Sequence, residues 1–490
     1  MLWVPDGTVV IIGGGMAGLT AAAYLTRAGF SVKVFEQHTQ PGGYVSSFTR
    51  QGFTFPAGPA SFGSNGIIFP ILAELGLTEK LQFIRAGQQI SWDAHDVPLQ
   101  NPAQTRHELE CCFPDEKAAL RRYFRWVAIG GSAFHDSLKG GMMFGRGVIK
   151  TMLRVILKHP LSSWALWVAG KNTNRSLHDH YFKNGTLRQL LDRLGYPVMS
   201  GRNTLGMWAS YYHDTWVPKG SMQAFADLIA RYIRDHGGEV RLGTRVGQIR
   251  IENGQAAGVE FQDGGFVPAD WVVSAADLYQ TCFRLIGRSR LPPAMIGKLE
   301  KARPSESMFT VFLGLNNSQD LSNSLKRFKE SHVGYTCSGG QYIKLIYLSK
   351  DDPSSAPEGK HALLIACLSP YEDWEDLKGS RQAYQARKAA YTDMLISQAE
   401  EFLPGLSAHI AVMDAATPLT CERYTANWRG STAGWNWDPK VAPHFDLDKD
   451  LPVKRLYPIG HTVHNPGGVP TAMITAWYIA GNIVRQAGKP

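Results

Sequence analysis

Residues 8–36 read TVVIIGGGMAGLTAAAYLTRAGFSVKVFE, and this stretch decides the fold. The β-branched residues 8–12 predict a buried strand, which a glycine-rich turn connects to a helix over 19–27. Gly29 ends that helix, and a second apolar strand then ends in an acid, Glu36. Strand, tight turn, helix and strand in this order predict an α/β fold with a Rossmann-type sheet.

Three glycines in the turn, Gly13, Gly15 and Gly18, have the GxGxxG spacing of a dinucleotide site. The first permits the tight turn, the second lets the backbone approach a pyrophosphate, and the third lets the helix pack close to the strand. The helix N-terminus offers free N–H groups to the phosphates. Glu36 is placed to accept hydrogen bonds from the adenosine ribose. A glycine-rich loop of an ordinary α/β domain is the alternative, and the complete order of elements favours the dinucleotide site.

The composition describes a globular chain of more than one domain. Its 490 residues exceed what one core accommodates, and 44% hydrophobic with 19% charged residues excludes a disordered or fibrous class. The six cysteines show neither a CxxC pair nor metal-ligand spacing, so we expect no disulfide, no metal site and a cytoplasmic location. We also expect no signal peptide, because the nucleotide-binding pattern begins by Thr8, and no transmembrane helix, because the longest uncharged run, 466–484, is rich in small residues.

The net charge of +9 is concentrated in one segment. Residues 117–202 carry fifteen Lys and Arg against three Asp, and large apolar residues are interleaved with them. This pattern indicates either peripheral contact with a membrane surface or a helical domain with a solvated basic face, and the sequence leaves both open. Nucleic acid is not indicated, because no recognised binding motif accompanies the charge.

Further motifs follow the first one along the chain. They are Pro41-Gly-Gly43, Gly52-Phe-Thr-Phe-Pro-Ala-Gly-Pro59, Pro218-Lys-Gly-Ser-Met-Gln223, Gly243-Thr-Arg-Val246, Val272-Val-Ser-Ala-Ala-Asp277 and Gly460-His-Thr-Val-His-Asn-Pro-Gly-Gly-Val-Pro470. Their order resembles flavin-dependent oxidoreductases of the phytoene desaturase and carotenoid isomerase group, close to the amine oxidase superfamily. The resemblance covers nearly the whole chain and implies FAD as cofactor. Two positions depart from the family's pattern: Tyr44 stands where Arg is frequent, and Pro56 where Asp is frequent.

The resemblance also implies a set of cofactor-binding residues. It assigns Gly13, Gly15 and Gly18 to the pyrophosphate, Glu36 to the ribose and the Val246 backbone to the adenine, although a core role for Val246 is an equal alternative. A helix N-terminus at Val469 would stabilise negative charge on the reduced flavin. The remaining residues expected at the cofactor are Met16, Ala17, Gln37, Gly42, Gly43, Gly58, Pro59, Ala60, Ser61, Gly460, Gly468 and Pro470.

The same resemblance implies a domain plan. We expect a discontinuous FAD-binding domain from residues 1–95, 205–300 and 438–490, a basic helical insertion over 96–204, and a mixed-sheet substrate domain over 301–437. The insertion would give the substrate access or contact the membrane.

The expected activity is FAD-dependent oxidation–reduction at carbon–carbon bonds of a long apolar, carotenoid-like polyene, by desaturation, saturation or cis–trans isomerisation. The alternatives are a flavin amine oxidase that uses oxygen and a non-catalytic FAD-binding protein. His464 is the candidate catalytic side chain, weighed against a structural hydrogen bond. The candidate substrate residues are aromatic, with ordinary core as their alternative: Trp208, Tyr212, Trp216, Trp428 and Trp435. The sequence leaves the electron acceptor and the oligomeric state open.

Overall fold

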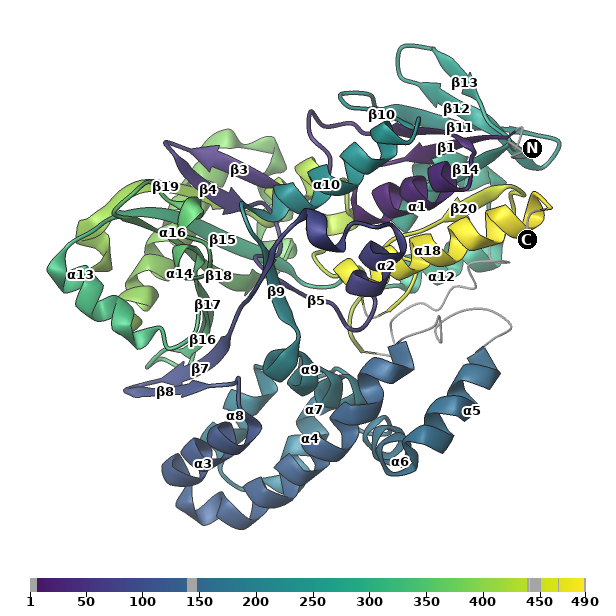
Figure 1. Ribbon diagram of the computed structural model, residues 1–490. Helices are drawn as coiled ribbons and strands as arrows, with labels where there is room; N and C mark the ends of the chain where they lie inside the picture. The colour runs from purple at the N-terminus through teal and green to yellow at the C-terminus, as the bar shows by residue number, and fades with distance from the viewer. Residues whose placement is uncertain (1–6, 139–147, 439, 441–450, 466, 489–490) are drawn as a thin grey trace.

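Strand β1 (Thr8–Ile12) lies at the centre of a parallel sheet in the computed structural model, which describes residues 7–138, 148–438, 440, 451–465 and 467–488. The five strands have the order β10-β2-β1-β14-β20 (Figure 1). Their bounds are β2 (Ser31–Phe35), β10 (Glu239–Arg241), β14 (Trp271–Ser274) and β20 (Leu456–Pro458). The expected Rossmann-type α/β sheet is confirmed, and it is assembled from distant parts of the chain.

Both faces of this sheet are covered. Helix α1 (Met16–Arg27) contacts α10 (Met222–Asp235) and α18 (Val469–Gln486), and together they form one layer. On the other side β12 packs against β14, within an antiparallel sheet of β11 (Val246–Glu252), β12 (Gln255–Phe261) and β13 (Phe266–Pro268). The turn between β11 and β12 is Asn253-Gly254, and both residues have positive φ, as expected for an Asn-Gly hairpin turn.

A second, mixed sheet of seven strands forms the left side of Figure 1. Its order is β19 (Ile410–Ala416), β15 (Ser307–Asn316), β18 (Lys360–Ser369), β17 (Tyr342–Tyr347), β16 (His332–Thr336), β7 (Gln88–Trp92) and β8 (His95–Pro98). Helix α16 (Arg381–Phe402) covers one face, where Phe309, Leu345 and Phe402 share a core. Strand β7 pairs in parallel with β16, so this sheet draws on residues before the expected domain boundary at 95.

Small elements connect the two sheets. They are the hairpin β3 (Ser47–Arg50) and β4 (Phe53–Pro56), a sheet of β5 (Phe62–Gly63), β9 (Thr215–Pro218) and β6 (Phe83–Arg85), and helices α2 (Ile68–Glu74) and α12 (Pro293–Lys301). Phe53 and Phe55 of β4 pack against Phe312 and Leu364 of the seven-stranded sheet.

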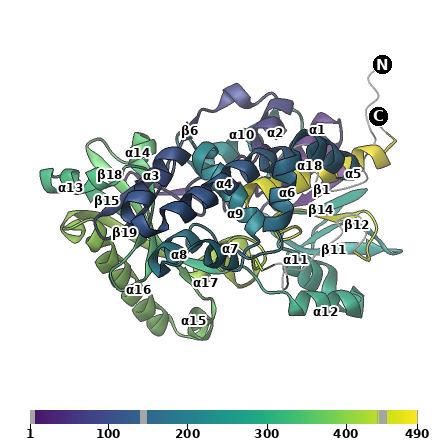
Figure 2. The same cartoon turned by 90° about the horizontal axis from the view of Figure 1, so that it is seen from below.

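Helices fill the third part of the molecule, at the bottom of Figure 1. They are α3 (Pro102–Cys112), α4 (Lys117–Leu138), α5 (Val148–Lys158), α6 (Pro160–Ala169), α7 (Asn174–Tyr181), α8 (Gly185–Asp192) and α9 (Gly201–His213). In the view from below, α4, α6 and α9 overlap one another (Figure 2), and α4 contacts both α6 and α9. Within the described ranges, no helix combines the length and the apolar character that a membrane span requires.

The contact between α1 and β1 depends on one glycine. A Cβ atom added at Gly18 would lie 1.9 Å from the carbonyl oxygen of Gly13, so any side chain there forces the helix away from the strand. Gly297 in α12 is different, because a Cβ there would meet no atom within 4 Å.

We therefore expect Gly18→Ala to destabilise the protein by about 1–3 kcal/mol through overpacking. Gly297→Ala is the matched control, and it should stabilise by about 0.5–1 kcal/mol because alanine loses less backbone entropy than glycine in a helix. Urea unfolding of both apoproteins measures the two changes. Equal stability of the two variants would contradict the proposed packing role of Gly18.

Candidate functional site

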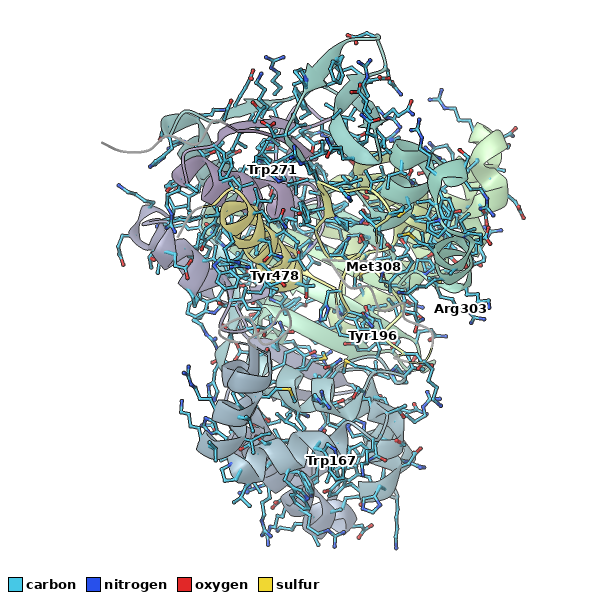
Figure 3. The ribbon with its side chains drawn as sticks, turned by 90° about the vertical axis from the view of Figure 1, so that its right-hand side faces the viewer. Trp167, Tyr196, Trp271, Arg303, Met308 and Tyr478 are labelled. Atoms are coloured by element: carbon cyan, nitrogen blue, oxygen red, sulfur yellow. The ribbon has the colours of Figure 1, made fainter. Side chains whose placement is uncertain are left out.

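A cavity of about 800 Å³ lies where the three parts of the molecule meet. Its walls are the carboxyl ends of β1, β2 and β14, the first turn of α18 and one face of the seven-stranded sheet. Figure 3 shows Met308 at the middle of the molecule, between Trp271 of the parallel sheet and Trp167 of the helical part. Ligands of open α/β sheets bind at the carboxyl ends of the strands, so the cavity is the candidate site.

The glycine turn after β1 forms one end of the cavity. Gly13 has φ +95°, a conformation that favours glycine, and it directs the chain into α1. Gly15 and Gly42 form an isolated parallel bridge, which brings the doublet Gly42-Gly43 against the first turn of the helix. A Cβ added at Gly15 would have only the Gly42 carbonyl oxygen near it, at 4.0 Å. The backbone N–H groups at the start of α1 are therefore open to a phosphate.

Glu36 follows β2 at the same end. Its side chain is 6% exposed and lines the cavity. The carboxylate accepts hydrogen bonds from the backbone N–H of Gly14, at 2.6 Å, and of His38, at 2.9 Å. Val246, the first residue of β11, and Gln37 line the cavity beside it. An acid held against the phosphate turn is the arrangement that an adenosine ribose needs.

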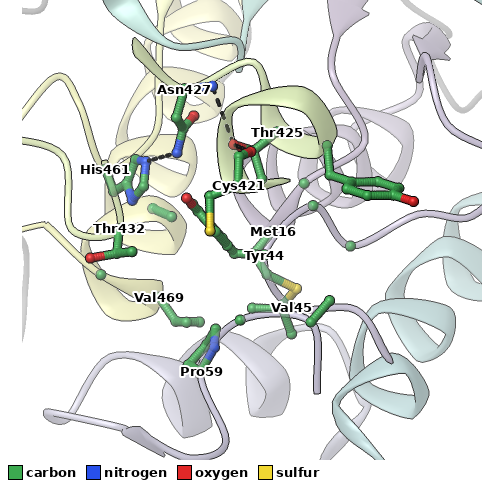
Figure 4. A pocket seen from close by; sticks show the side chains of 18 of the residues that line it. Met16, Tyr44, Val45, Pro59, Cys421, Thr425, Asn427, Thr432, His461 and Val469 are labelled. Atoms are coloured by element: carbon green, nitrogen blue, oxygen red, sulfur yellow. Dashed lines mark hydrogen bonds between the residues drawn. The ribbon is translucent and has the colours of Figure 1, made fainter. Parts of the chain in front are cut away.

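Helix α18 begins at the opposite end of this groove. Gly468 has φ +130° and precedes Val469, the first residue of the helix, with Pro470 in the first turn. The first-turn N–H groups have no acceptor inside their own helix, and they carry the positive end of its dipole. Figure 4 shows Val469 and Pro59 close to Val45 and Met16 around one space. A flavin ring that becomes anionic on reduction fits this helix terminus.

Tyr44 and His461 lie side by side at this end, with ring centroids 6.2 Å apart. The Tyr44 hydroxyl donates to the carbonyl oxygen of Ser431, at 2.9 Å, and burial raises its pKa. Asn427 Nδ2 donates to His461 Nε2 at 3.1 Å (Figure 4), and burial lowers the pKa of His461 to about 4. Both side chains are therefore neutral at pH 7, and Tyr44 supplies no cation where the family often has Arg.

The seven-stranded sheet supplies an apolar wall. Cavity-lining residues alternate along its strands, and most have no charge: Met308, Thr310 and Phe312 of β15, Leu364 and Ala366 of β18, Ile346 of β17 and Ala416 of β19. Across β17 and β16 the same face turns polar, with Lys344 and His332. Tyr342, Tyr211 and Arg193 also line this part. The part of the cavity beyond the N-terminus of α18 is thus mostly apolar, and its far side is polar.

All the residues expected at the cofactor line this one cavity except Gly18, which packs between α1 and β1. His464 is not among the lining residues, whereas His461 is. His461 shares the signature block with His464, and spacing alone could not show which ring faces the site.

The five aromatic residues expected at the substrate do not line the cavity. Trp208 and Tyr212 belong to the helical core, where Trp208 Nε1 donates to the Tyr123 hydroxyl at 2.8 Å. Trp216 packs on Phe69. Trp428 stacks on Tyr279 at 4.3 Å, and Trp435 is 2% exposed. Trp208, Tyr212 and Trp435 are thus buried in cores, whereas Trp216 and Trp428 are partly buried and pack against the core of the nucleotide-binding part.

Sequence reasoning did not single out the polar lining residues His332, Lys344 and Arg193. One signal was present for Lys344, because a lysine interrupts the apolar pattern of residues 342–348. His332 and Arg193 have no such local signal, since they reach the site through the pairing of β16 and the end of α8. Within the described residues, no group of three His, Cys, Asp or Glu side chains is placed to hold a metal.

The glycine turn, the buried acid and the two helix termini fit an extended FAD, with the adenosine at Glu36 and the flavin at Val469. Fold and site together define an FAD-dependent oxidoreductase. The chain belongs to the flavin-containing amine oxidoreductase family, whose model matches residues 16–484. Bound FAD supplies hydride-transfer chemistry, and the protein binds it, orients the substrate and excludes water.

Named relatives cover nearly the whole chain. It is 26% identical to the neurosporene-forming phytoene desaturase of Rhodobacter capsulatus, over 99% of this chain and 95% of that protein. It is also 26% identical to the chloroplastic prolycopene isomerase of Daucus carota, over 86% of this chain and 71% of that protein. A solved oxidoreductase structure from Methanosarcina mazei has a TM-score of 0.65 at 15% identity, over 97% of this chain and all of that one, and supports the fold.

The lowered pKa of His461 predicts a specific pH dependence of stability. The unfolded chain binds a proton near the ordinary pKa of 6.5, whereas the folded chain does so only near 4. Between these values the unfolded state holds the extra proton, so stability falls as pH decreases, by about 1.4 kcal/mol per pH unit from this group.

His461→Gln keeps an acceptor for Asn427 and lacks this titration. Its stability deficit against wild type should therefore shrink as pH falls through this window, and a constant deficit would contradict the assignment. Thermal unfolding of both apoproteins over a pH series measures it.

Proposed function

We propose that this oxidoreductase acts on carbon–carbon bonds of a long apolar polyene, by desaturation, saturation or cis–trans isomerisation. The observation that carries the proposal is the apolar face of the seven-stranded sheet, which continues the cavity beyond the first turn of α18. An uncharged wall of Met308, Phe312, Leu364 and Ala366 suits an extended chain that has no polar groups along its length. The names of the two relatives, a phytoene desaturase and a prolycopene isomerase, support a polyene.

The residues of the cavity divide the work in this proposal. Gly13, Gly15 and Glu36 hold the adenosine and pyrophosphate, and the first turn of α18 faces the flavin. The sheet face positions the reacting bond against the flavin, while the helical part closes the cavity against water. No side chain donates or removes a proton in this scheme, and neutral His461 and Tyr44 keep the flavin end free of charge.

A block in the apolar wall tests this proposal. Ala366 is 3% exposed and lies between Thr310 and Lys344 on the cavity face, so Ala366→Trp should fill the substrate space without reaching the nucleotide end. Leu368→Trp on the same strand is the control, because Leu368 is 48% exposed and does not line the cavity. We expect kcat/KM for polyene turnover to fall at least about tenfold, or about 1.4 kcal/mol, in the first variant alone.

The absorbance spectrum of each purified variant should show an unchanged flavin. A lipid extract of the wild-type protein identifies a co-purified polyene, which then serves as the substrate. Hydrogen peroxide release from a panel of amines, with no polyene turnover, would overturn the proposal in favour of an amine oxidase. A flavin that no substrate or acceptor can cycle would favour a non-catalytic protein.

We also propose that the protein docks on a membrane surface through helices α5 and α6. Exposed apolar side chains cluster there and form the α5–α6 patch: Met152, Leu153, Ile156, Leu157, Leu161, Trp164 and Trp167. Leu157 is 81% exposed and Leu161 70%. The exposed Arg154 and Lys158, one turn apart on α5, flank the apolar stripe, as in helices that lie in the lipid interface. Such contact would let an apolar substrate enter without crossing water.

Two variant pairs separate the apolar and the electrostatic contribution to docking. Leu157→Ser with Trp164→Ser should weaken co-sedimentation with both neutral and anionic vesicles, since apolar insertion drives both. Arg154→Gln with Lys158→Gln should weaken binding to anionic vesicles only, roughly tenfold or more at about 1 kcal/mol per basic residue. Leu368→Ser is the control for loss of an exposed apolar side chain elsewhere. Wild-type binding by all variants would show that these helices present a solvated face.

A further inference from the structure

Lys344 is the one lysine among the described residues that line the cavity. It lies at the middle of β17, where residues alternate between the two faces of the sheet. Ile343 and Leu345 are buried on the face covered by α16. Tyr342, Lys344 and Ile346 therefore face the cavity, and the lysine interrupts an otherwise apolar wall.

The neighbours of Lys344 across the sheet leave room for its side chain. It pairs with Gly334 of β16 on one side and with Ala366 of β18 on the other. Both neighbours are small and uncharged, so they provide space and no counter-charge. Surrounding protein lowers the pKa of Lys344 by desolvation of its ammonium group.

No carboxylate in the cavity lining balances this charge. The acidic residues among the described lining residues are Glu36, at the nucleotide end, and Asp277, whose carboxylate accepts from the backbone N–H groups of Tyr279 and Gln280. Among the described residues, Lys344 takes part in no ion pair. The Lys344 side chain is exposed to the cavity, so a carboxylate that enters the cavity can reach its ammonium group.

His332 is a second polar group at the same end. It lines the cavity from the neighbouring strand, and its side chain is 8% exposed. Its Nδ1 lies 3.0 Å from Ser331 Oγ. Its buried Nε2 has no hydrogen-bond partner among the described residues. Asp351 Oδ2 is 3.9 Å from Nδ1 and does not line the cavity. Burial and the charge of Lys344 lower the pKa of His332 to about 3, so its ring is neutral.

Arg193 and Tyr342 close this end of the cavity. The Arg193 guanidinium lies 5.6 Å from the Tyr342 ring centroid, and its Nη1 donates to Thr336 Oγ1 at 2.8 Å. Arg193 therefore adds positive charge while its donors are engaged with the protein. The strand order β15-β18-β17-β16 places Lys344 two strands, and His332 three strands, from Thr310 on β15. The cavity is thus apolar along one stretch and basic at its end.

We propose that Lys344 binds a carboxylate at one end of the polyene substrate, with His332 Nε2 as the second polar contact. This inference rests on the proposed function and adds to it a substrate class, an apolar polyene chain that ends in a carboxylic acid. The ammonium supplies a charge-assisted hydrogen bond, and the carboxylate supplies the counter-charge that the cavity lacks. His332 Nε2 donates or accepts according to which ring nitrogen holds the proton.

The binding of a polyene acid and of its ester tests the inference. The probes are β-apo-8′-carotenoic acid and its ethyl ester, which share one chain and differ in the charge of the end group. We expect the FAD-loaded wild-type protein to bind the acid about tenfold or more tightly than the ester, as one hydrogen bond to a charged group provides. Quenching of protein fluorescence and a shift of the flavin spectrum both report the dissociation constants.

Variants at position 344 separate this role from a structural one. Lys344→Met should bind acid and ester within about twofold of each other, and its ester affinity should match wild type. Lys344→Arg retains the charge and should retain most of the preference for the acid. Lys350→Met is the matched control, since Lys350 is exposed and does not line the cavity. Lys344 is exposed and takes part in no ion pair with the residues that the structure describes, so Lys344→Met should change stability by less than about 0.5 kcal/mol and the variant should fold.

Three outcomes would overturn the inference. Equal affinity of the wild-type protein for acid and ester would show that no carboxylate site exists. Equal weakening of both probes by Lys344→Met would make the lysine a packing residue, and an altered flavin spectrum in the ligand-free variant would assign it to the cofactor. If neither probe binds while the flavin is present, the proposed polyene function fails and the inference fails with it.

Discussion

The close approach of helix α1 to strand β1 is the constraint on which the rest of the site depends. Gly18 allows it, because any Cβ there would collide with the Gly13 carbonyl oxygen. The approach fixes the first turn of α1, against which the Gly42-Gly43 doublet then lies through the bridge between Gly15 and Gly42. Glu36 precedes this doublet in the chain and Tyr44 follows it, and the two residues line opposite ends of the cavity. A single backbone contact thus orients the adenosine end and the flavin end together.

The two faces of the seven-stranded sheet have different roles, because one packs in the core and the other lines the cavity. Along β15 and β17 one set of alternate residues packs into the core under α16, and the other set borders the cavity. The core face requires bulky apolar residues, and this fixes which residues point the other way. The cavity face is free of that requirement, so it can carry Thr310, Gly334 and Lys344 without loss of the fold. In the proposed function, the residues that select the substrate therefore lie on the face that core packing leaves free.

The charged residues that line the cavity differ between its nucleotide end, its flavin end and its far end. The nucleotide end of the cavity holds the buried acid Glu36, and Asp277 follows β14, where burial raises its pKa to about 6. The flavin end holds neutral Tyr44 and His461, beside a helix N-terminus whose dipole is the principal positive feature there. The far end holds Lys344 and Arg193. A cofactor with an anionic middle and a substrate with an apolar middle find different surroundings in one continuous space.

The sequence by itself determined the Rossmann-type sheet and FAD as cofactor, and almost every residue that it predicts at the nucleotide lines the cavity, because these residues belong to local turns whose glycines and acid are readable in the chain. It also predicted a mixed sheet within residues 301–437, although not which face of that sheet borders a ligand. Only the tertiary structure decided that β7 joins the seven-stranded sheet, that Trp208 and Trp435 pack in cores, and that His461 rather than His464 borders the cavity. Each of these depends on contacts between residues far apart in sequence, where large aromatic residues look the same whether they line a cavity or fill a core. Lys344, His332 and Arg193 come from three separate segments, and only strand pairing and the packing of the helical part bring them to one end of the site.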